Sequence, residues 1–121
     1  MAKRALCAVL LIAASCASEA RPETADYIIE AILVPRCGRA GCHSSETAQH
    51  GYAFDTIDHA TAALKSTDRG MTLVVPGDAQ RSDLYTVISG TRDVMPPDSP
   101  LAQADIDLIE TWIDDGAAGL E

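Results

Sequence analysis

The sequence centres on the stretch Cys37-Gly38-Arg39-Ala40-Gly41-Cys42-His43, in which four residues separate two thiols and a histidine directly follows the second. Covalent attachment of a haem needs two reduced thiols within reach of two vinyl groups on one porphyrin edge. It also needs a histidine that can ligate the iron from the same segment. The usual signature is C-x-x-C-H, so the longer gap must bulge, which its two glycines permit at little conformational cost. We therefore predict haem attachment at Cys37 and Cys42, with His43 as the proximal iron ligand.

Two other uses of these side chains stay open at this point. Two cysteines in an exported protein often form a disulfide, and a Cys37–Cys42 disulfide would leave His43 with no special role. A zinc site of the Cys-Cys-His kind would use the same three residues, but the sequence offers no convincing fourth ligand cluster.

A methionine near the C-terminal end is a candidate for the opposite, distal iron ligand. Low-spin electron-transfer haems commonly take a methionine thioether opposite the histidine. Met71 lies in an apolar run and is interpreted as core filling, whereas Met95 precedes two prolines that restrict the backbone. Met95 is therefore the predicted distal ligand. His50 and His59 are minor alternatives, and each is expected to be a surface histidine.

The first residues have the pattern of a secretory signal. A basic start is followed by the apolar stretch 5–14 and then by small residues. Ten apolar residues are too few to span a bilayer as a helix, so no permanent transmembrane segment is expected. The run Ala13-Ala14-Ser15-Cys16 resembles a bacterial lipobox, which predicts a mature chain that begins at an acylated Cys16. Ordinary cleavage near Ala17 or Ala20 is the alternative.

The net charge argues against some classes of partner. The full sequence carries −9, and removal of residues 1–15 takes away Lys3 and Arg4 but no acidic residue, which gives −11. Such a surface repels nucleic acid and anionic headgroups and favours basic partner surfaces. We expect no nucleic-acid partner, and contact with a membrane only through the lipid anchor.

The remaining residues predict one small domain at 24–119, preceded by a tether at 16–23. Helices are predicted over 24–34, 56–65, 83–89 and 102–115. The first is expected to begin at an N-cap at Thr24 and to end at Pro35, and the third to begin at Ser82 and to end at Gly90. Gly116 is expected to end the last helix. Between them, 70–75 is expected to be extended, 76–78 to form a turn and 91–100 to form a proline-rich loop.

The helical periodicity also predicts which side chains face the core. The first helix is expected to present Tyr27, Ile28, Ala31, Ile32 and Leu33. The third and last helices are expected to bury Leu84, Tyr85, Ile88, Ile106, Leu108, Ile109, Trp112 and Ile113.

Four pieces of the sequence follow one another in a specific order: CGRAGCH (37–43), PGDAQRSDLYTVISG (76–90), MPPDSPL (95–101) and IDLIETWIDDGAA (106–118). This order resembles monohaem class I c-type cytochrome domains of the short type found in exported bacterial proteins. The likeness covers residues 25–119, and the four-residue cysteine gap is its main departure from the common pattern.

The resemblance implies an all-α, class I cytochrome c-like fold with N- and C-terminal helices that cross beside a covalently bound haem. The crossing would bring Ile28 and Ile32 close to Ile109 and Trp112. The resemblance also implies thioethers at Cys37 and Cys42, with His43 and Met95 as the axial ligands.

The sequence thus predicts an electron-transfer protein and not an enzyme. It would be periplasmic or cell-envelope bound, with one haem c, and would carry one electron between redox partner proteins with basic docking surfaces. Arg39, Tyr52 and Arg92 are candidates for the haem propionates. One alternative is a haem sensor or peroxidase-like protein with an open sixth position, where Arg92 would be a polar distal group. The other is a non-haem lipoprotein domain held by a Cys37–Cys42 disulfide.

Overall fold

The structure, a computed structural model, describes residues 20–121, so the predicted signal and the acylation site at Cys16 lie outside the described residues. This part of the chain is mostly helical, with a short antiparallel hairpin that the all-α prediction omitted. Its elements are α1 (Ala25–Ile28), η1 (Ile29–Leu33), α2 (Val34–Cys37), η2 (Gln49–Gly51), α3 (Ile57–Leu64), β1 (Thr67–Asp68), β2 (Met71–Thr72), η3 (Ala79–Arg81), α4 (Asp83–Ile88) and α5 (Gln103–Asp114).

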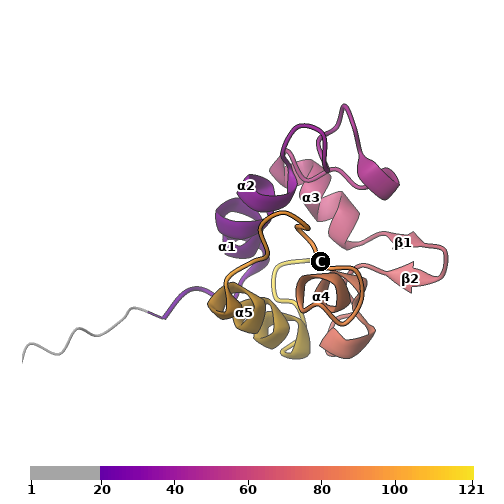
Figure 1. The fold of residues 1–121 in the computed structure, drawn as a ribbon. Helices are drawn as coiled ribbons and strands as arrows, with labels where there is room; N and C mark the ends of the chain where they lie inside the picture. Colours follow the sequence, from indigo (N-terminus) through magenta and orange to yellow (C-terminus); the bar gives the residue numbers. More distant parts are fainter. Residues whose placement is uncertain (1–19) are drawn as a thin grey trace, which may run out of the picture.

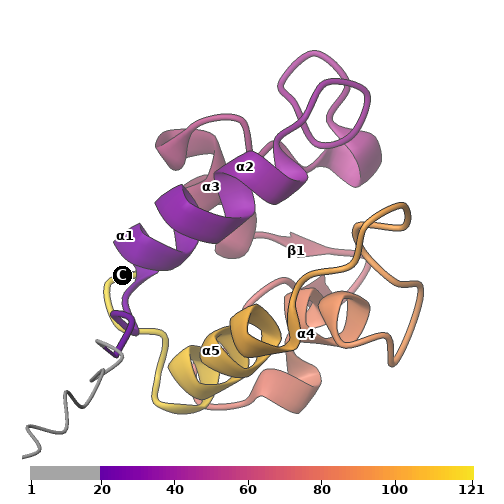
Figure 2. The same ribbon diagram turned by 60° about the vertical axis from the view of Figure 1, so that its left-hand side comes forward.

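The elements form two layers (Figures 1 and 2). The continuous helix α1–η1–α2 lies with α3 in one layer, and α4 lies with α5 in the other. The hairpin links α3 of one layer to η3 and α4 of the other, and the 91–100 loop, which joins α4 to α5, reaches toward the first layer on the same side (Figure 2).

The first helix begins as predicted but does not end at Pro35. Thr24 Oγ1 accepts a hydrogen bond from the backbone N–H of Tyr27 at 3.4 Å, which confirms the predicted cap. The helix then widens into the π-turn η1, where the Val34 N–H bonds to the Ile29 carbonyl five residues back. The shifted pairing accommodates Pro35, which has no N–H, in the first turn of α2. As a result the helix continues as far as Cys37.

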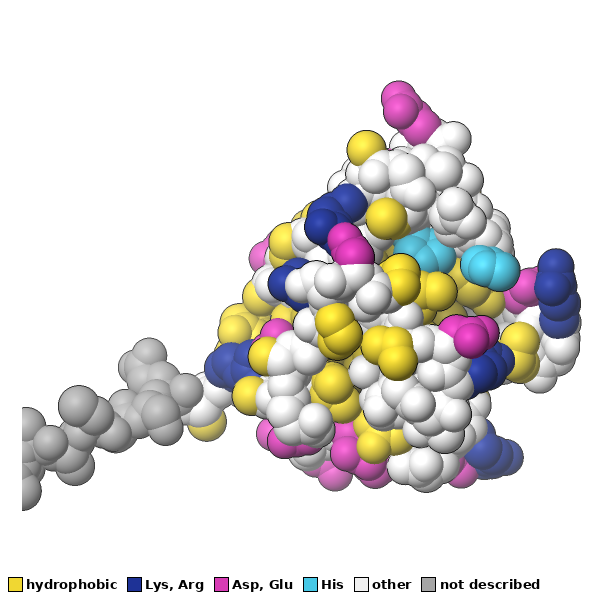
Figure 3. Space-filling model, viewed as in Figure 1, with side chains coloured by type: hydrophobic (Ala, Val, Ile, Leu, Met, Phe, Trp, Pro, Cys, Tyr) yellow, Lys and Arg dark blue, Asp and Glu magenta, His cyan; other side chains and the backbone are white. Residues whose placement is uncertain are grey.

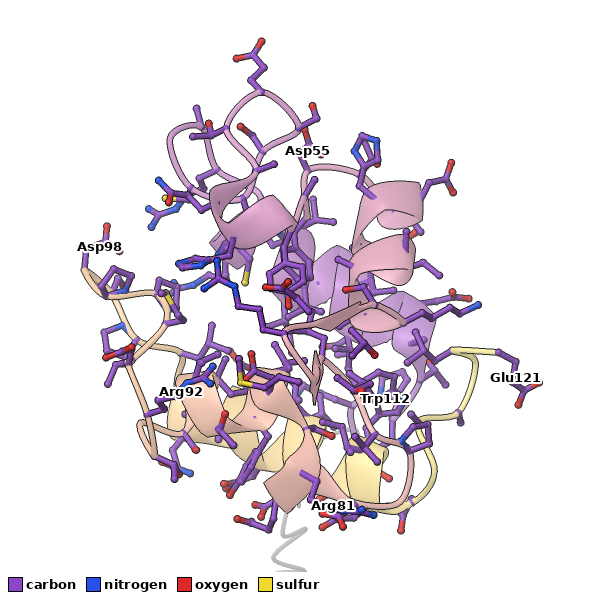
Figure 4. All side chains as sticks on the ribbon, turned by 90° about the vertical axis from the view of Figure 1, so that its right-hand side faces the viewer. Asp55, Arg81, Arg92, Asp98, Trp112 and Glu121 are labelled. Carbon is purple, nitrogen blue, oxygen red and sulfur yellow. The ribbon has the colours of Figure 1, made fainter. Side chains whose placement is uncertain are left out.

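One hydrophobic cluster joins both layers. Trp112 is its largest fully buried side chain, and the predicted apolar stripe of α5 is buried as expected (Figure 4). On the first helix the prediction needs one correction, because Ala31 is exposed and Ile29 is buried in the core instead. Tyr27 and Tyr85 are half-buried and pack against the cluster.

The chain after α5 turns back to the start of the domain (Figure 2). α5 ends at Asp114, with Gly116 in the left-handed region as the predicted stop. The Ala118 carbonyl then accepts two hydrogen bonds, from the Ala25 N–H at 2.9 Å and from Trp112 Nε1 at 3.0 Å. This carbonyl therefore ties the N-terminal helix to the last one.

Two details in the middle of the chain differ from the prediction. Ser82 holds the N-cap position of α4, but its buried hydroxyl accepts from the Val75 N–H at 2.8 Å and donates to the Asp78 carbonyl at 2.9 Å. It therefore fixes the turn before α4 instead of capping the helix. Within the expected extended stretch 70–75, only Met71–Thr72 forms a strand.

Shortening a core side chain of α5 should destabilise the domain strongly. Ile109 is fully buried, so Ile109→Ala should lower the free energy of unfolding by about 2–5 kcal/mol, since it leaves a cavity. Chemical denaturation of the purified protein measures this. Exposed Asp107 on the same helix provides the control, and Asp107→Ala should change stability by less than about 0.5–1 kcal/mol. Equal effects of the two variants would contradict this packing.

Candidate cofactor site

A cavity of about 540 Å³ lies between the two layers. Cys37, Cys42 and His43 line it from the segment that follows the first helix, and Met95 lines it from the loop after α4. The fold therefore brings all four predicted site residues to one cavity. Its volume is typical of binding pockets for small molecules and cofactors. On the face in Figure 3, hydrophobic side chains gather beside the histidines.

The walls of the cavity are largely apolar. The lining includes Phe54, Leu73, Leu84, Val87, Ile88, Pro96 and Pro97. A flat macrocycle with an apolar body would exclude water from these walls and gain the free energy of burying its rings. The same cavity offers two thiols and an imidazole, which a c-type haem needs, and a thioether, which electron-transfer haems commonly add as the second axial ligand. The residues therefore fit this group.

The His43 ring is oriented by the segment that follows it. Its Nδ1 lies 3.3 Å from the Tyr52 carbonyl oxygen, so an Nδ1–H can donate there and leave Nε2 unprotonated. The ring also meets the Phe54 ring edge-on, at 5.6 Å between centroids and 86° between planes. A backbone carbonyl that fixes the tautomer and direction of an imidazole is the usual support of a metal-binding histidine.

The two thiols are both free and half-buried. Cys37 is the last residue of α2, and burial raises the pKa of its thiol to about 11, so this thiol is protonated at neutral pH. Cys42 lies in the next turn, where its N–H donates to the Arg39 carbonyl at 3.0 Å. Within residues 20–121, no three His, Cys, Asp or Glu side chains converge as a metal site.

The two methionines of the described chain both line the cavity. Met95 is half-buried, and its N–H donates to the Val87 carbonyl at 3.0 Å, which fixes the loop to α4. The prediction that Met71 fills the core is wrong. It is 38% exposed on β2, and its Sδ accepts from Arg92 Nη1 at 2.8 Å. The sequence did not predict this exposed position, because an apolar neighbourhood does not show which face of a short strand is buried.

The two other histidines separate in the structure. His50 is exposed and lines the cavity, so it stays a minor alternative as a ligand. His59 does not line the cavity, and its Nδ1 instead pairs with Asp55 Oδ1 at 2.7 Å. The structure therefore does not bring His59 to the site.

One end of the cavity is polar. Tyr52 lies there with Asp68, Arg69, Asp83 and Arg92. Burial is the main cause that raises the pKa of the Tyr52 hydroxyl, and the carboxylates of Asp68 and Asp83 add to it. Arg92 forms an ion pair with Asp83, whose side chain is only 11% exposed. Sequence reasoning named Tyr52 and Arg92 but missed Asp83 and Arg69.

Two further arginines lie close to the thiols. Arg39, a predicted propionate partner, does not line the cavity and pairs with Asp98 at 3.2 Å. Arg36 does line it, and its Nη2 donates to the Ser99 carbonyl at 2.7 Å. The only sequence signal for Arg36 was its place directly before the first thiol. Both arginines tie this segment to the loop that carries Met95.

Asp55 holds the loop that follows His43, and it should make the stability of the folded domain depend on pH. Its Oδ2 accepts from the Ser45 N–H at 2.7 Å. Hydrogen bonding to the Ser45 side chain, then to this N–H and then to His59, lowers the pKa of the carboxyl well below its usual value. Ionised Asp55 therefore stabilises the folded state above about pH 4, and this contribution is lost as the pH falls further. Asp55→Asn should lose less of its thermal stability between about pH 6 and pH 3 than the parent does.

Thermal unfolding followed across this pH range measures the effect. Asp58→Asn, at an exposed residue of the first turn of α3, serves as the matched control and should follow the parent. Identical pH profiles for Asp55→Asn and Asp58→Asn would show that Asp55 has no such role.

In the described chain, no helix has the length and apolar character needed to cross a membrane.

Comparison with known families gives one match. The family model described as Planctomycete cytochrome C matches residues 40–99, a segment that includes Cys42, His43 and Met95 and begins three residues after Cys37. Comparisons with curated proteins and with solved structures gave no significant match. Proteins of the c type hold haem covalently and use it in electron transfer. The chain belongs to the Planctomycete cytochrome C family, a family of c-type cytochromes.

Proposed function

We propose that this chain is an exported electron carrier with a single haem c, attached through Cys37 and Cys42 and ligated by His43 and Met95. One observation supports this most directly. The four side chains come from opposite ends of the domain, yet they line the same apolar cavity. Core packing alone does not require two thiols, an imidazole and a thioether to line one cavity.

The chain's own residues would hold the ligands in place. The Tyr52 carbonyl orients His43, and the bond from the Met95 N–H to the Val87 carbonyl anchors the distal loop. When bound, the haem supplies an iron that cycles between ferrous and ferric states. Fixed ligands and apolar walls limit how much the site must rearrange when its charge changes by one. At the polar end, Tyr52 and Arg69 would take the propionate carboxylates, while Arg92 stays paired with Asp83.

We also propose the class I arrangement, in which α1–η1–α2 and α5 cross beside the haem. Two features support it: both helices contribute to one hydrophobic cluster, and the Ala118 carbonyl bonds to both. Export, acylation at Cys16 and basic redox partners rest on the sequence signal and on the acidic charge.

An open sixth position is the second candidate arrangement, because Arg92 lines the cavity and could serve as a polar distal group. Its guanidinium, however, is already bound to Asp83 and to Met71 Sδ. This engagement favours the electron carrier over a sensor or peroxidase-like site.

Denaturing gel electrophoresis with haem staining tests the proposal. The full-length precursor is produced with a haem-attachment system, beside a Cys37→Ser/Cys42→Ser control. Haem should stay with the denatured parent chain and be absent from the control. A colourless parent chain with Cys37 and Cys42 joined in a disulfide would identify the non-haem alternative instead.

A further inference from the structure

Gly38, the first residue of the cysteine gap, is packed directly against the backbone of Phe54 and Asp55. A Cβ on Gly38 would lie 2.6 Å from the Phe54 carbonyl carbon and 2.7 Å from the Asp55 Cα, and would also overlap the Phe54 oxygen. These neighbours are backbone atoms, which cannot rotate away as the end of a side chain can. The φ of Gly38 is −78°, which any residue adopts. Space, and not backbone conformation, therefore requires glycine here.

The other glycine of the gap has a different role. Gly41 has a φ of +81°, and a Cβ there would meet no atom within 4 Å. It permits the turn before Cys42, as the sequence suggested for both glycines. Only Gly38 sets how closely the segment after Cys37 approaches the rest of the site.

The segment opposite Gly38 is held from several sides and cannot easily retreat. The Phe54 side chain is buried, and its N–H donates to the His43 carbonyl at 2.6 Å. Asp55 accepts from the Ser45 N–H and from His59 Nδ1, both at 2.7 Å. A group added at Gly38 would therefore displace the end of α2 and not the Phe54–Asp55 segment.

Displacement of that helix end would move Cys37 first. Besides its peptide bond to Cys37, Gly38 is held to the helix by the hydrogen bond from its N–H to the Val34 carbonyl, at 3.1 Å. The Cys37 carbonyl accepts a hydrogen bond from the His43 N–H at 3.2 Å. This bond links the backbone of Cys37 to that of His43 across the cysteine gap. Loss of the close approach would separate Cys37 from His43, while the bonds from His43 to Tyr52 and Phe54 would remain.

We propose that Gly38 is a positioning residue that keeps Cys37 at the cavity across a four-residue gap, so that both thiols can form thioethers. This inference rests on the proposed function, because it concerns attachment at Cys37. In each attachment the thiol adds across a vinyl double bond: sulfur bonds to one carbon and the thiol proton goes to the other. No oxidant or reductant is consumed.

The test is Gly38→Ala in the full-length precursor, produced with a haem-attachment system. The pyridine haemochrome spectrum reports how many vinyl groups are saturated. The parent should show two thioethers and Gly38→Ala only one, with the His43-ligated iron retained. Gly51→Ala is the control, because a Cβ there meets open space, unlike at Gly38, and Gly51 does not line the cavity; its φ of +81° makes alanine strained there. It should keep two thioethers despite its backbone strain.

A double variant separates positioning from general structural damage. If Gly38 acts only through Cys37, Cys37→Ser/Gly38→Ala should hold as much one-thioether haem as Cys37→Ser alone. Two thioethers in Gly38→Ala would overturn the inference. So would a double variant that loses the haem which Cys37→Ser retains. A parent chain without covalent haem would instead refute the proposed function, so the two failures are distinguishable.

Discussion

Met95→Ala should give a ferrous protein that binds carbon monoxide rapidly, which the parent should not do. Removal of the thioether opens the sixth position and removes the ligand that favours reduced iron. The midpoint potential should therefore fall by roughly 100 mV or more. Absorption spectra with and without carbon monoxide measure the first effect, and a redox titration measures the second.

Met71→Ala is the matched control, since it removes the same chemical group from the same cavity. Met71 is exposed on the hairpin and bonded to Arg92, so its loss should leave the iron closed to carbon monoxide. If Met71→Ala opened the iron and Met95→Ala did not, the distal ligand would be Met71 and our assignment would be wrong.

Cys42→Ser should lose covalent haem more severely than Cys37→Ser. Cys42 is adjacent to His43, so haem held by this thiol alone still has its proximal ligand in place. Cys37 lies at the other end of the cysteine gap, where one backbone hydrogen bond of 3.2 Å connects it to His43, and burial raises the pKa of its thiol to about 11. We expect Cys37→Ser to keep a one-thioether haem and Cys42→Ser to keep little. Haem-stain intensity per mole of protein measures both, and the reverse order would contradict the assigned roles.

The parts of the fold that sequence predicted well depend on local physics. Thr24 caps the first helix and Gly116 ends the last one, because capping and left-handed turns involve only neighbouring residues. Pro35 was expected to end its helix. It does not, because the π-turn before it changes the pairing of the backbone, a response that residue preferences do not encode. Ser82 likewise bonds to a turn fixed by tertiary packing.

The site divides in the same way. The adjacency of Cys42 and His43 is visible in the sequence, and so is a methionine followed by two prolines. That these residues line one cavity depends on how the two layers pack. The pairing of Arg39 with Asp98, away from the cavity, depends on the same packing. The pairing of Asp83 with Arg92 and the close approach at Gly38 are contacts between separate parts of the fold. No spacing rule predicts them.

The most direct test is the pyridine haemochrome spectrum of the full-length, exported protein, read together with its thiol content. Our account predicts one haem per chain with both vinyl groups saturated, and no free thiol at Cys37 or Cys42. A colourless protein, or a haem whose vinyl groups are both intact, would contradict it.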